Sequence, residues 1–147
     1  MPDERPAQTY ATHTRWHPIF HFFALPVLAL NVLYSLYVIY RNPGFASIWG
    51  AIVAIALVMV GLLARVYGLR NQDRIIRLEE RVRLGALVPD DLRARIGELS
   101  TSDLIGLRFC SDDEVVDAVR AVLSGERKGR RDIKAGVKTW RPDYHRL

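Results

Sequence analysis

Cysteine and the signatures of catalysis are nearly or wholly missing from this sequence. Its 147 residues include one cysteine, Cys110, so no disulfide can form within the chain, and we expect this thiol to pack as a small hydrophobic group. No Cys and His residues have the spacing of a zinc site, and the motifs GxSxG, GxGxxG, HExxH and the P-loop do not occur. We therefore expect no enzyme activity, no catalytic residue and no cofactor.

Charged residues are also nearly missing from one long stretch. Between residues 19 and 64, Arg41 is the only Lys, Arg, Asp or Glu, whereas the whole chain has 21 basic and 16 acidic residues. A water-soluble domain interleaves apolar and charged residues along its elements. The segregation predicts an apolar membrane part followed by a charged part, and the net charge of +5 is compatible with an anionic lipid surface.

Two apolar segments fill this stretch. Residues 19–40 and 45–64 each contain about 20 residues, the number that a helix needs to cross a bilayer core of about 30 Å. Arg-Asn-Pro-Gly at 41–44 is typical of a tight turn, and so short a connection makes two helices antiparallel. The first segment is too long for the apolar part of a signal peptide, and no cleavage motif of small residues follows it. We predict an all-α fold built on a transmembrane hairpin at 19–64.

Basic residues on the two sides of this hairpin predict its orientation. The turn carries only Arg41, whereas six arginines follow the second segment in quick succession: Arg65, Arg70, Arg74, Arg77, Arg81 and Arg83. Loops rich in Lys and Arg stay in the cytoplasm, so we expect both termini to be cytoplasmic and the protein to reside in the cytoplasmic membrane. Residues 1–18 then form a cytoplasmic N-terminal segment.

Three residues interrupt the uniform apolar character of the first segment. Pro26 should kink the helix because it removes one backbone hydrogen bond. Asn31 and Ser35 lie four residues apart, which places two polar groups on one face in the middle of the membrane. We interpret them as groups that hydrogen-bond between helices, and the alternative is a path for a ligand or a proton.

The second segment and the charged run at 65–84 are expected to form one helix, because no proline or strong cap occurs before Gly85. Positions spaced three and four apart form one seam on this helix: Ser47, Gly50, Ala54, Leu57, Gly61, Ala64, Gly68, Asn71, Ile75, Leu78 and Val82. The seam has mostly small residues inside the membrane, where they let helices approach closely. Below the membrane it has Ile, Leu and Val, which associate in water.

Two interpretations of this seam remain open. In a parallel homodimer the seam would pair with its own copy, and Arg74 and Glu79 would occupy positions g and e′, which attract each other across such an interface. In the other interpretation, the small residues pack on the first segment and the larger apolar residues pack on the C-terminal helices. Within the helix, Glu79 and Arg83 are expected to form an ion pair four residues apart.

Residues 85–147 are expected to form a cytoplasmic module of three or four short helices with a basic tail. "PDDLRARIGEL" begins with proline and acids, as a helix does, and "STSDLIGLRF" offers Ser or Thr caps. "SDDEVVDAVRAVL" contains a capping box from Ser111 to Glu114, which we prefer to a carboxylate metal site. "DIKAGVKTW" aligns Ile133, Val137 and Trp140 on one face of a last helix.

The hairpin, the stretch "NQDRIIRLEERVRL", the stretch "LRARIGELS" and the closing "DIKAGVKTWRPDYHRL" together resemble a family of small bacterial membrane proteins with two spans. That family is defined only as a domain of unknown function, and Q-D-R-x-I-R-L-E-E-R is the signature that carries the resemblance. The resemblance extends over nearly the whole chain. It implies a bacterial inner membrane, but it implies no activity, cofactor or catalytic residue.

Three histidines precede or begin the first segment with a spacing of four: His13, His17 and His21. On one helix they would share a face, which is the spacing of metal or haem ligands. However, Pro18 disfavours helix at His17, so His13 should lie outside the helix. We prefer to interpret them as polar residues at the membrane interface rather than as metal ligands.

Basic residues accumulate towards the C-terminus, together with an aromatic residue: Arg127, Lys128, Arg130, Arg131, Lys134, Lys138 and Trp140. Close to a membrane, such a stretch is typical of binding to lipid headgroups. The alternatives are a solvated helix and a core position for Trp140. A nucleic-acid partner is not expected, because basic and acidic residues are mixed along the chain.

These features favour a non-catalytic, membrane-anchored interaction or accessory protein, which presents a charged helical module to a partner or to the anionic membrane surface. The expected partners are the lipid bilayer and either a second copy or a larger membrane-protein complex. The alternative is a membrane protein that handles a small molecule or a lipid through the kinked first segment and the interfacial histidines.

Overall fold

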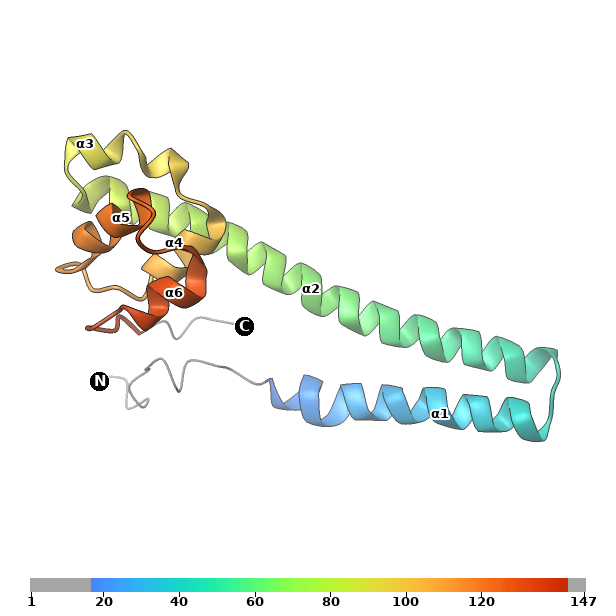
Figure 1. The fold of residues 1–147 in the computed structure, drawn as a ribbon. Helices are drawn as coiled ribbons and strands as arrows, with labels where there is room; N and C mark the ends of the chain where they lie inside the picture. Colours follow the sequence, from blue (N-terminus) through green and yellow to red (C-terminus); the bar gives the residue numbers. More distant parts are fainter. Residues whose placement is uncertain (1–16, 143–147) are drawn as a thin grey trace, which may run out of the picture. The chain divides into compact units, whose positions relative to one another are not determined.

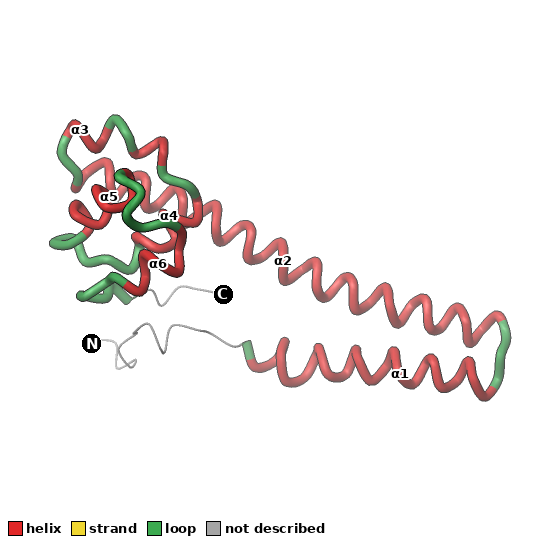
Figure 2. The backbone as a smooth tube through the Cα atoms, viewed as in Figure 1, coloured by secondary structure: helices red, strands yellow, loops and turns green. Residues whose placement is uncertain are grey.

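All regular elements of the computed structural model, which describes residues 17–142, are helices (Figure 2). Within that range, the one pairing of extended backbone is an isolated antiparallel bridge between Cys110 and Trp140. The described residues divide into two compact units, a hairpin at 17–70 and a module at 71–142. The all-α fold expected from the sequence is therefore confirmed.

Two antiparallel helical arms joined by a short turn form the hairpin (Figure 1). The first arm consists of a π-helical segment, η1 (Ile19–Ala24), followed by the α-helix α1 (Leu25–Arg41). The second arm is the first part of α2 (Phe45–Leu87). Both arms are long and apolar enough to cross a membrane, as the sequence predicted.

Pro26 accounts for the change of register in the first arm. A proline has no N–H to donate, and in an α-helix its ring collides with the carbonyl oxygen four residues earlier. Directly before it, the N–H of Leu25 bonds to the carbonyl oxygen of Phe20, which is the i→i−5 pattern of a π-helix. The wider π turn thus accommodates the proline.

The turn between the arms is held by Ser47. Its hydroxyl donates to the carbonyl oxygen of Asn42 at 2.8 Å and accepts from the N–H of Gly44 at 3.1 Å. One side chain thus satisfies two backbone groups that a tight turn leaves without helical partners. This local bonding fixes the point at which the chain reverses direction.

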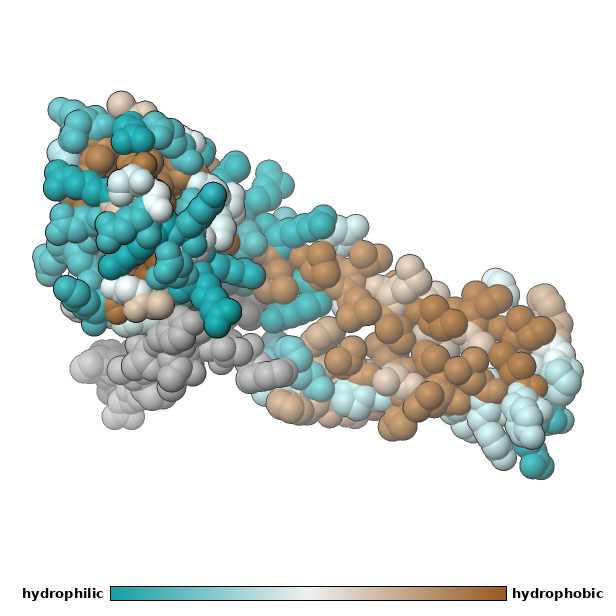
Figure 3. All heavy atoms as spheres, in the orientation of Figure 1, coloured by the Kyte–Doolittle hydropathy of each residue, from teal (hydrophilic) through white to brown (hydrophobic). Residues whose placement is uncertain are grey.

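Small residues of α2 face the first arm inside the hairpin. Ala51 and Ala54 are buried, and Leu28 fills the space beside Gly61, where its Cδ1 would lie 3.5 Å from an added Cβ. Large apolar side chains instead cover the outside of both arms, as the brown surface in Figure 3 shows. The hairpin is therefore closely packed along one line and apolar on its outer surface.

The helix α2 continues beyond Gly85, where the sequence suggested that it would end. It extends to Leu87, and its 43 residues correspond to a length of about 65 Å. Glycine in a helix interior costs only about 1 kcal/mol, which the neighbouring packing offsets. The helix ends because Pro89 disfavours helical backbone at Val88.

Five short helical segments follow in the module (Figure 1): α3 (Asp90–Arg93), the 3₁₀ segment η2 (Ile96–Glu98), α4 (Thr101–Leu107), α5 (Val115–Leu123) and α6 (Gly129–Ala135). Their apolar side chains form one core with the end of α2. The core consists of Leu84, Val88, Leu92, Ile96, Leu99, Leu104, Leu107, Cys110, Val115, Ala118, Val119 and Ile133. The module is therefore built around the last turns of α2.

Two helices of the module approach each other closely at Gly106 of α4. A Cβ added at this glycine would lie 2.9 Å from Cβ of Ile133 and 3.2 Å from Cα of Arg130, both in α6. No side chain fits in this space. The absence of a side chain at Gly106 is what allows α6 to pack on α4.

The two expected helix caps in the module have different outcomes. Ser100 and Asp103 form a complete capping box at the start of α4, in agreement with the caps expected there. The capping box expected from Ser111 to Glu114 does not form, because Glu114 is itself the N-cap of α5 and its carboxylate is bonded elsewhere. It accepts from the backbone N–H groups of Lys138 and Thr139.

The last helix differs from the expected one as well. α6 begins at Gly129 and ends at Ala135, so Val137 and Trp140 follow the helix instead of lying on it. The segment after Gly136 is drawn along the loop at 108–111 by the bridge between Cys110 and Trp140. Tertiary hydrogen bonds to this loop thus replace the helical continuation.

Candidate functional site

Polar groups from three distant segments meet in the module, at the end of α2. Arg83 donates from Nη1 to Oε2 of Glu80 at 2.9 Å and from Nη2 to Oδ1 of Asp112 at 2.6 Å. The same guanidinium also donates to the carbonyl oxygen of Cys110 at 2.8 Å. Arg83 is thus the centre of a polar cluster that joins α2 to the loop before α5.

The third segment of this cluster is the chain after α6. Arg141 lies with Nη1 3.4 Å from Oε1 of Glu80, and its backbone N–H donates to the carbonyl oxygen of Phe109 at 2.8 Å. The N–H of Ser111 donates to the carbonyl oxygen of Thr139 at 3.1 Å. Together these bonds hold the C-terminal segment against the loop at 108–111.

Burial sets the electrostatics of Glu80. Its side chain is almost inaccessible to water, and this desolvation raises the pKa of the carboxyl group above its ordinary value. Arg83, Arg141 and Arg108 oppose the shift through their positive charges. The neighbouring Asp112 is exposed, and its hydrogen bond from Arg83 lowers its pKa.

Aromatic and cationic side chains surround Phe109, which is fully buried. The rings of Phe109 and Trp140 lie 4.9 Å apart, and the charged groups of Arg108 and Lys134 each lie 4.6 Å from the centre of the Phe109 ring. Cations over an aromatic face are attracted by its quadrupole. Trp140 and Lys134 therefore contribute to the packing around Phe109.

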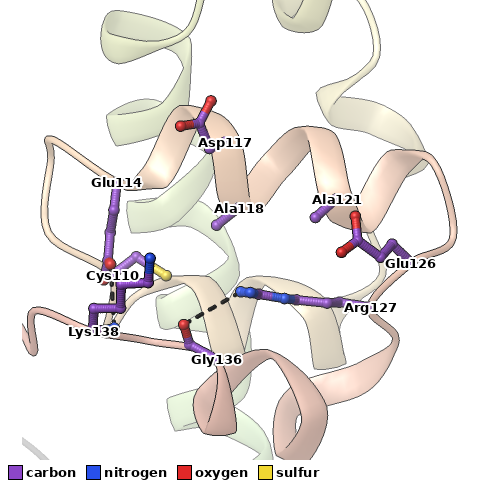
Figure 4. A pocket seen from close by; sticks show the side chains of 9 residues that line it. All are labelled: Cys110, Glu114, Asp117, Ala118, Ala121, Glu126, Arg127, Gly136 and Lys138. Carbon is purple, nitrogen blue, oxygen red and sulfur yellow. Dashed lines mark hydrogen bonds between the residues drawn. The ribbon is translucent and has the colours of Figure 1, made fainter.

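A cavity of about 280 Å³ is lined in part by Cys110 (Figure 4). Its lining combines acidic, basic and small residues: Cys110, Glu114, Asp117, Ala118, Ala121, Glu126, Arg127, Gly136 and Lys138. Arg127 reaches across it and donates to the carbonyl oxygen of Gly136 at 3.4 Å, as the dashed line shows. Acids and bases are mixed here, so the cavity has no single charge that would select a ligand.

Burial disfavours the reactive, deprotonated form of the cysteine in this cavity. Burial, with a contribution from the negative charge of Glu114, raises the pKa of Cys110 to about 12. The thiolate is the reactive form of cysteine, and it is scarce at neutral pH when the pKa is so high. Among the described residues, no group of three or more His, Cys, Asp or Glu side chains is placed to hold a metal ion.

Two of the three histidines that were predicted at the membrane interface lie within the described residues. His13 lies outside them, whereas His17 precedes η1 and His21 lies within it. Nδ1 of His21 is 3.0 Å from the backbone carbonyl oxygen of His17, so this pair interacts within its own turn. In the first arm, the hydroxyl of Ser35 likewise donates to the backbone of its own helix, at Asn31.

The structure divides the seam of α2 into parts with different surroundings. Ala54 is buried in the hairpin and Gly61 contacts Leu28, while Gly68 is half-buried. Gly50 and Ala64 are exposed on the hairpin. Within the module, the three large apolar residues of the seam are exposed: Ile75, Leu78 and Val82.

The basic residues near the C-terminus are also divided. Exposed side chains belong to Lys128, Arg130, Arg131 and Lys138. Arg127 is half-buried and bonded to Gly136, and Lys134 is buried against Phe109. The exposed basic surface therefore has its centre at the start of α6.

Sequence reasoning missed the polar cluster at Glu80. It expected Arg83 to pair with Glu79, whereas Arg83 bonds Glu80 and Asp112. A signal was present, because Glu80 lies four residues from both Ile76 and Leu84, in one row along the helix. All three residues of that row are buried.

Residues 5–147 match a protein family described as a family of unknown function, DUF6526. The chain belongs to this family. No curated protein and no solved structure matches the chain. The match includes both the hairpin and the module, so both units are parts of one family architecture.

Proposed function

We propose that this chain is a non-catalytic, membrane-anchored interaction protein of a bacterial cytoplasmic membrane. The hairpin is the anchor, and the module is the part that a partner or the membrane surface recognises. The observation that carries the proposal is the exposure of the apolar side chains on both arms of the hairpin. None of the apolar stretch of the first arm is buried, and only 11% of the corresponding stretch of α2 is buried.

This exposure favours a membrane hairpin over a pair of core helices in a soluble protein. A soluble protein buries its most apolar helices, whereas here Phe22, Leu33 and Ile52 are among many large side chains directed outward. The hydrocarbon core of a bilayer removes such surface from water at no cost to the polar backbone, because helices satisfy it internally. The apolar outer surface therefore supports a membrane location.

The distribution of arginines supports an orientation with both termini in the cytoplasm. Arg41 is the one basic residue at the turn, and Arg65 and Arg70 begin the basic run on the other side. This orientation places the module in the cytoplasm. There the exposed Lys128, Arg130 and Arg131 can reach anionic lipid headgroups or an acidic partner.

The contents of the module support recognition rather than catalysis. Polar groups such as Arg83 and Glu114 are engaged in ion pairs and backbone hydrogen bonds that stabilise the module. The thiol of Cys110 is held in its unreactive form. Purified protein that turned over a substrate by itself would contradict the proposal.

The anchor and its orientation can be tested with single cysteines in the full chain. Asn42→Cys places a thiol in the turn, and Asp117→Cys places one on the exposed face of α5. In spheroplasts, a membrane-impermeant maleimide should label the first variant directly and the second only after permeabilisation. The wild type is the control, since Cys110 is buried. Release of the protein by alkaline carbonate, or the reverse labelling pattern, would overturn the proposal.

A further inference from the structure

An apolar face of α2 is left without a partner inside the module. Ile75, Leu78 and Val82 have 54%, 61% and 76% of their surface exposed. They are spaced three and four residues apart, so they form one stripe along the helix. This segment follows the apolar arm, and the residues beside the stripe are charged, so we expect the segment to lie in water.

The module leaves this stripe free because it packs on the opposite face of the same helix. Ile76, Glu80 and Leu84 are buried beneath the module. With 3.6 residues per turn, the centre of this row lies on the opposite side of α2 from the centre of the exposed stripe. A second helix can therefore approach the stripe without displacing any part of the module.

We infer that the stripe of Ile75, Leu78 and Val82 binds the same stripe of a second copy, in a parallel two-stranded coiled coil. The inference names the partner that the proposed function leaves open, and it rests on that function for the common orientation of the two copies. In heptad terms, Ile75 and Val82 occupy position a and Leu78 occupies position d. β-Branched residues at a with Leu at d favour two parallel strands.

Charges beside the stripe select a second copy in the parallel orientation. Arg74 occupies position g and Glu79 the following position e, and both are exposed. In a parallel pair each Arg74 faces Glu79 of the other copy, so the interface gains two attractive contacts. In an antiparallel pair Arg74 would face the arginines at position g of the other copy, and Glu79 would face Glu79. The antiparallel arrangement is therefore repulsive.

The membrane compensates for the short length of the interface. The stripe spans less than two heptads, and free helices of that length associate weakly in water. Two copies inserted with the same orientation already have their α2 helices parallel, and confinement to one membrane raises their effective concentration. Within the hairpin, Ala54 and Gly61 face the first arm, so the proposed interface is confined to residues 71–82.

Disulfide cross-linking of the full chain in native membranes tests the inference. Leu78→Cys and Ile75→Cys should form cross-linked dimers under mild oxidation. Arg77→Cys, at an exposed position outside the stripe, is the matched control and should form few. The wild type should form none, because its single thiol is buried. Equal cross-linking at 75, 77 and 78, or none at 75 and 78, would overturn the inference.

Charge reversal provides a second test, in which the thiol at the interface stays the same and only the charges beside it change. In a Leu78→Cys background, Arg74→Glu or Glu79→Arg should each reduce cross-linking about twofold to thirtyfold, since two surface ion pairs of about 0.2–1 kcal/mol each are lost. The double exchange should restore it. Residues five apart are not neighbours on one helix, so restoration indicates a contact between copies. If the double exchange lowers cross-linking by the combined effect of the two single variants, the parallel arrangement is contradicted.

The two proposals fail separately in these experiments. If carbonate leaves the protein in the membrane but positions 75 and 78 do not cross-link, only the dimer is refuted. If carbonate releases the protein and the same positions still cross-link, the membrane anchor is refuted and the interface stands.

Discussion

Arg83 on α2 and Asp112 before α5 are joined by two hydrogen bonds, from Nε at 3.0 Å and from Nη2 at 2.6 Å. The same guanidinium binds Glu80. The side chain of Glu80 is only 5% exposed, whereas the side chain of Asp112 is 63% exposed. One arginine therefore serves a buried acid and a solvated acid. The two contacts differ in energy because water competes with only one of them.

Removal of Arg83 should be far more damaging than removal of its solvated partner. Arg83→Ala leaves the buried Glu80 with only the weaker attraction of Arg141 and Arg108. We therefore expect a loss of about 3 kcal/mol in the free energy of unfolding of the module. Asp112→Asn should cost less than about 1 kcal/mol, because that pair is exposed. Denaturant titration in mild detergent, followed by tryptophan fluorescence, measures both. Equal losses would show that the burial of Glu80 does not matter.

Glu80 should give the module a pH-dependent stability. Burial raises the pKa of Glu80 above its ordinary value of 4.5, so the folded state binds this proton more tightly than the unfolded state does. The stabilising contribution is then complete below 4.5 and is lost as the pH rises through the folded-state pKa. We therefore expect the free energy of unfolding of the wild type to fall, relative to that of Glu80→Gln, as the pH rises from 4.5 towards neutrality. The comparison cancels Asp112, whose lowered pKa acts in the opposite direction. A wild type that gained stability over this range would contradict the assignment.

Two glycines of the module should respond in opposite ways to the same substitution. Gly106→Ala places a Cβ 2.9 Å from Ile133, which forces α4 and α6 apart and should cost about 1–3 kcal/mol. Gly85→Ala lies within α2 with no atom within 4 Å of the new Cβ, so it should stabilise the helix by about 0.5–1 kcal/mol. Thermal denaturation followed by circular dichroism compares the two. A destabilising Gly85→Ala would mean that this part of the helix needs a glycine.

The exposed basic residues at the start of α6 should mediate contact with anionic lipid. In nanodiscs with anionic lipid, the backbone amides of α6 should exchange hydrogen more slowly than in nanodiscs with zwitterionic lipid. Replacement of Lys128, Arg130 and Arg131 by Gln should remove this difference in exchange between the two kinds of nanodisc. Each basic residue near an anionic surface contributes about 1 kcal/mol to binding. Salt should reduce it as well. Exchange that is indifferent to both changes would exclude a lipid-headgroup role.

Lys134 provides the matched control for that experiment. It belongs to the same helix, but it is buried against Phe109. Lys134→Gln should therefore lower the stability of the module and leave the difference between the two kinds of nanodisc in place. A loss of that difference without a change in stability would show that Lys134 reaches the lipid.

Local patterns in the sequence were sufficient for the two apolar helical segments and for the start of α4. The apolar segments at 19–40 and 45–64 and the turn between them are read directly from composition and length, because a helix satisfies its backbone within the segment itself. The capping box of Ser100 and Asp103 is equally local, since both partners lie within one turn. Such features depend on residues close in the chain, so one sequence contains the information that they require.

Only the tertiary structure decided how α2 is used. Below the hairpin this helix has two apolar stripes, one with Ile75 and Leu78 and another with Ile76 and Leu84, and helical periodicity ranks neither above the other. The module covers the second stripe, which buries Glu80 and leaves the first exposed. The carboxylate of Glu114 was likewise not predictable from its neighbours in the sequence. It accepts hydrogen bonds from backbone donors 24 and 25 residues away instead of capping its own helix. The local sequence allows either stripe of α2 to be buried and allows Glu114 to form a local cap. Contacts with residues distant in the chain determine which stripe is buried and which hydrogen bonds form.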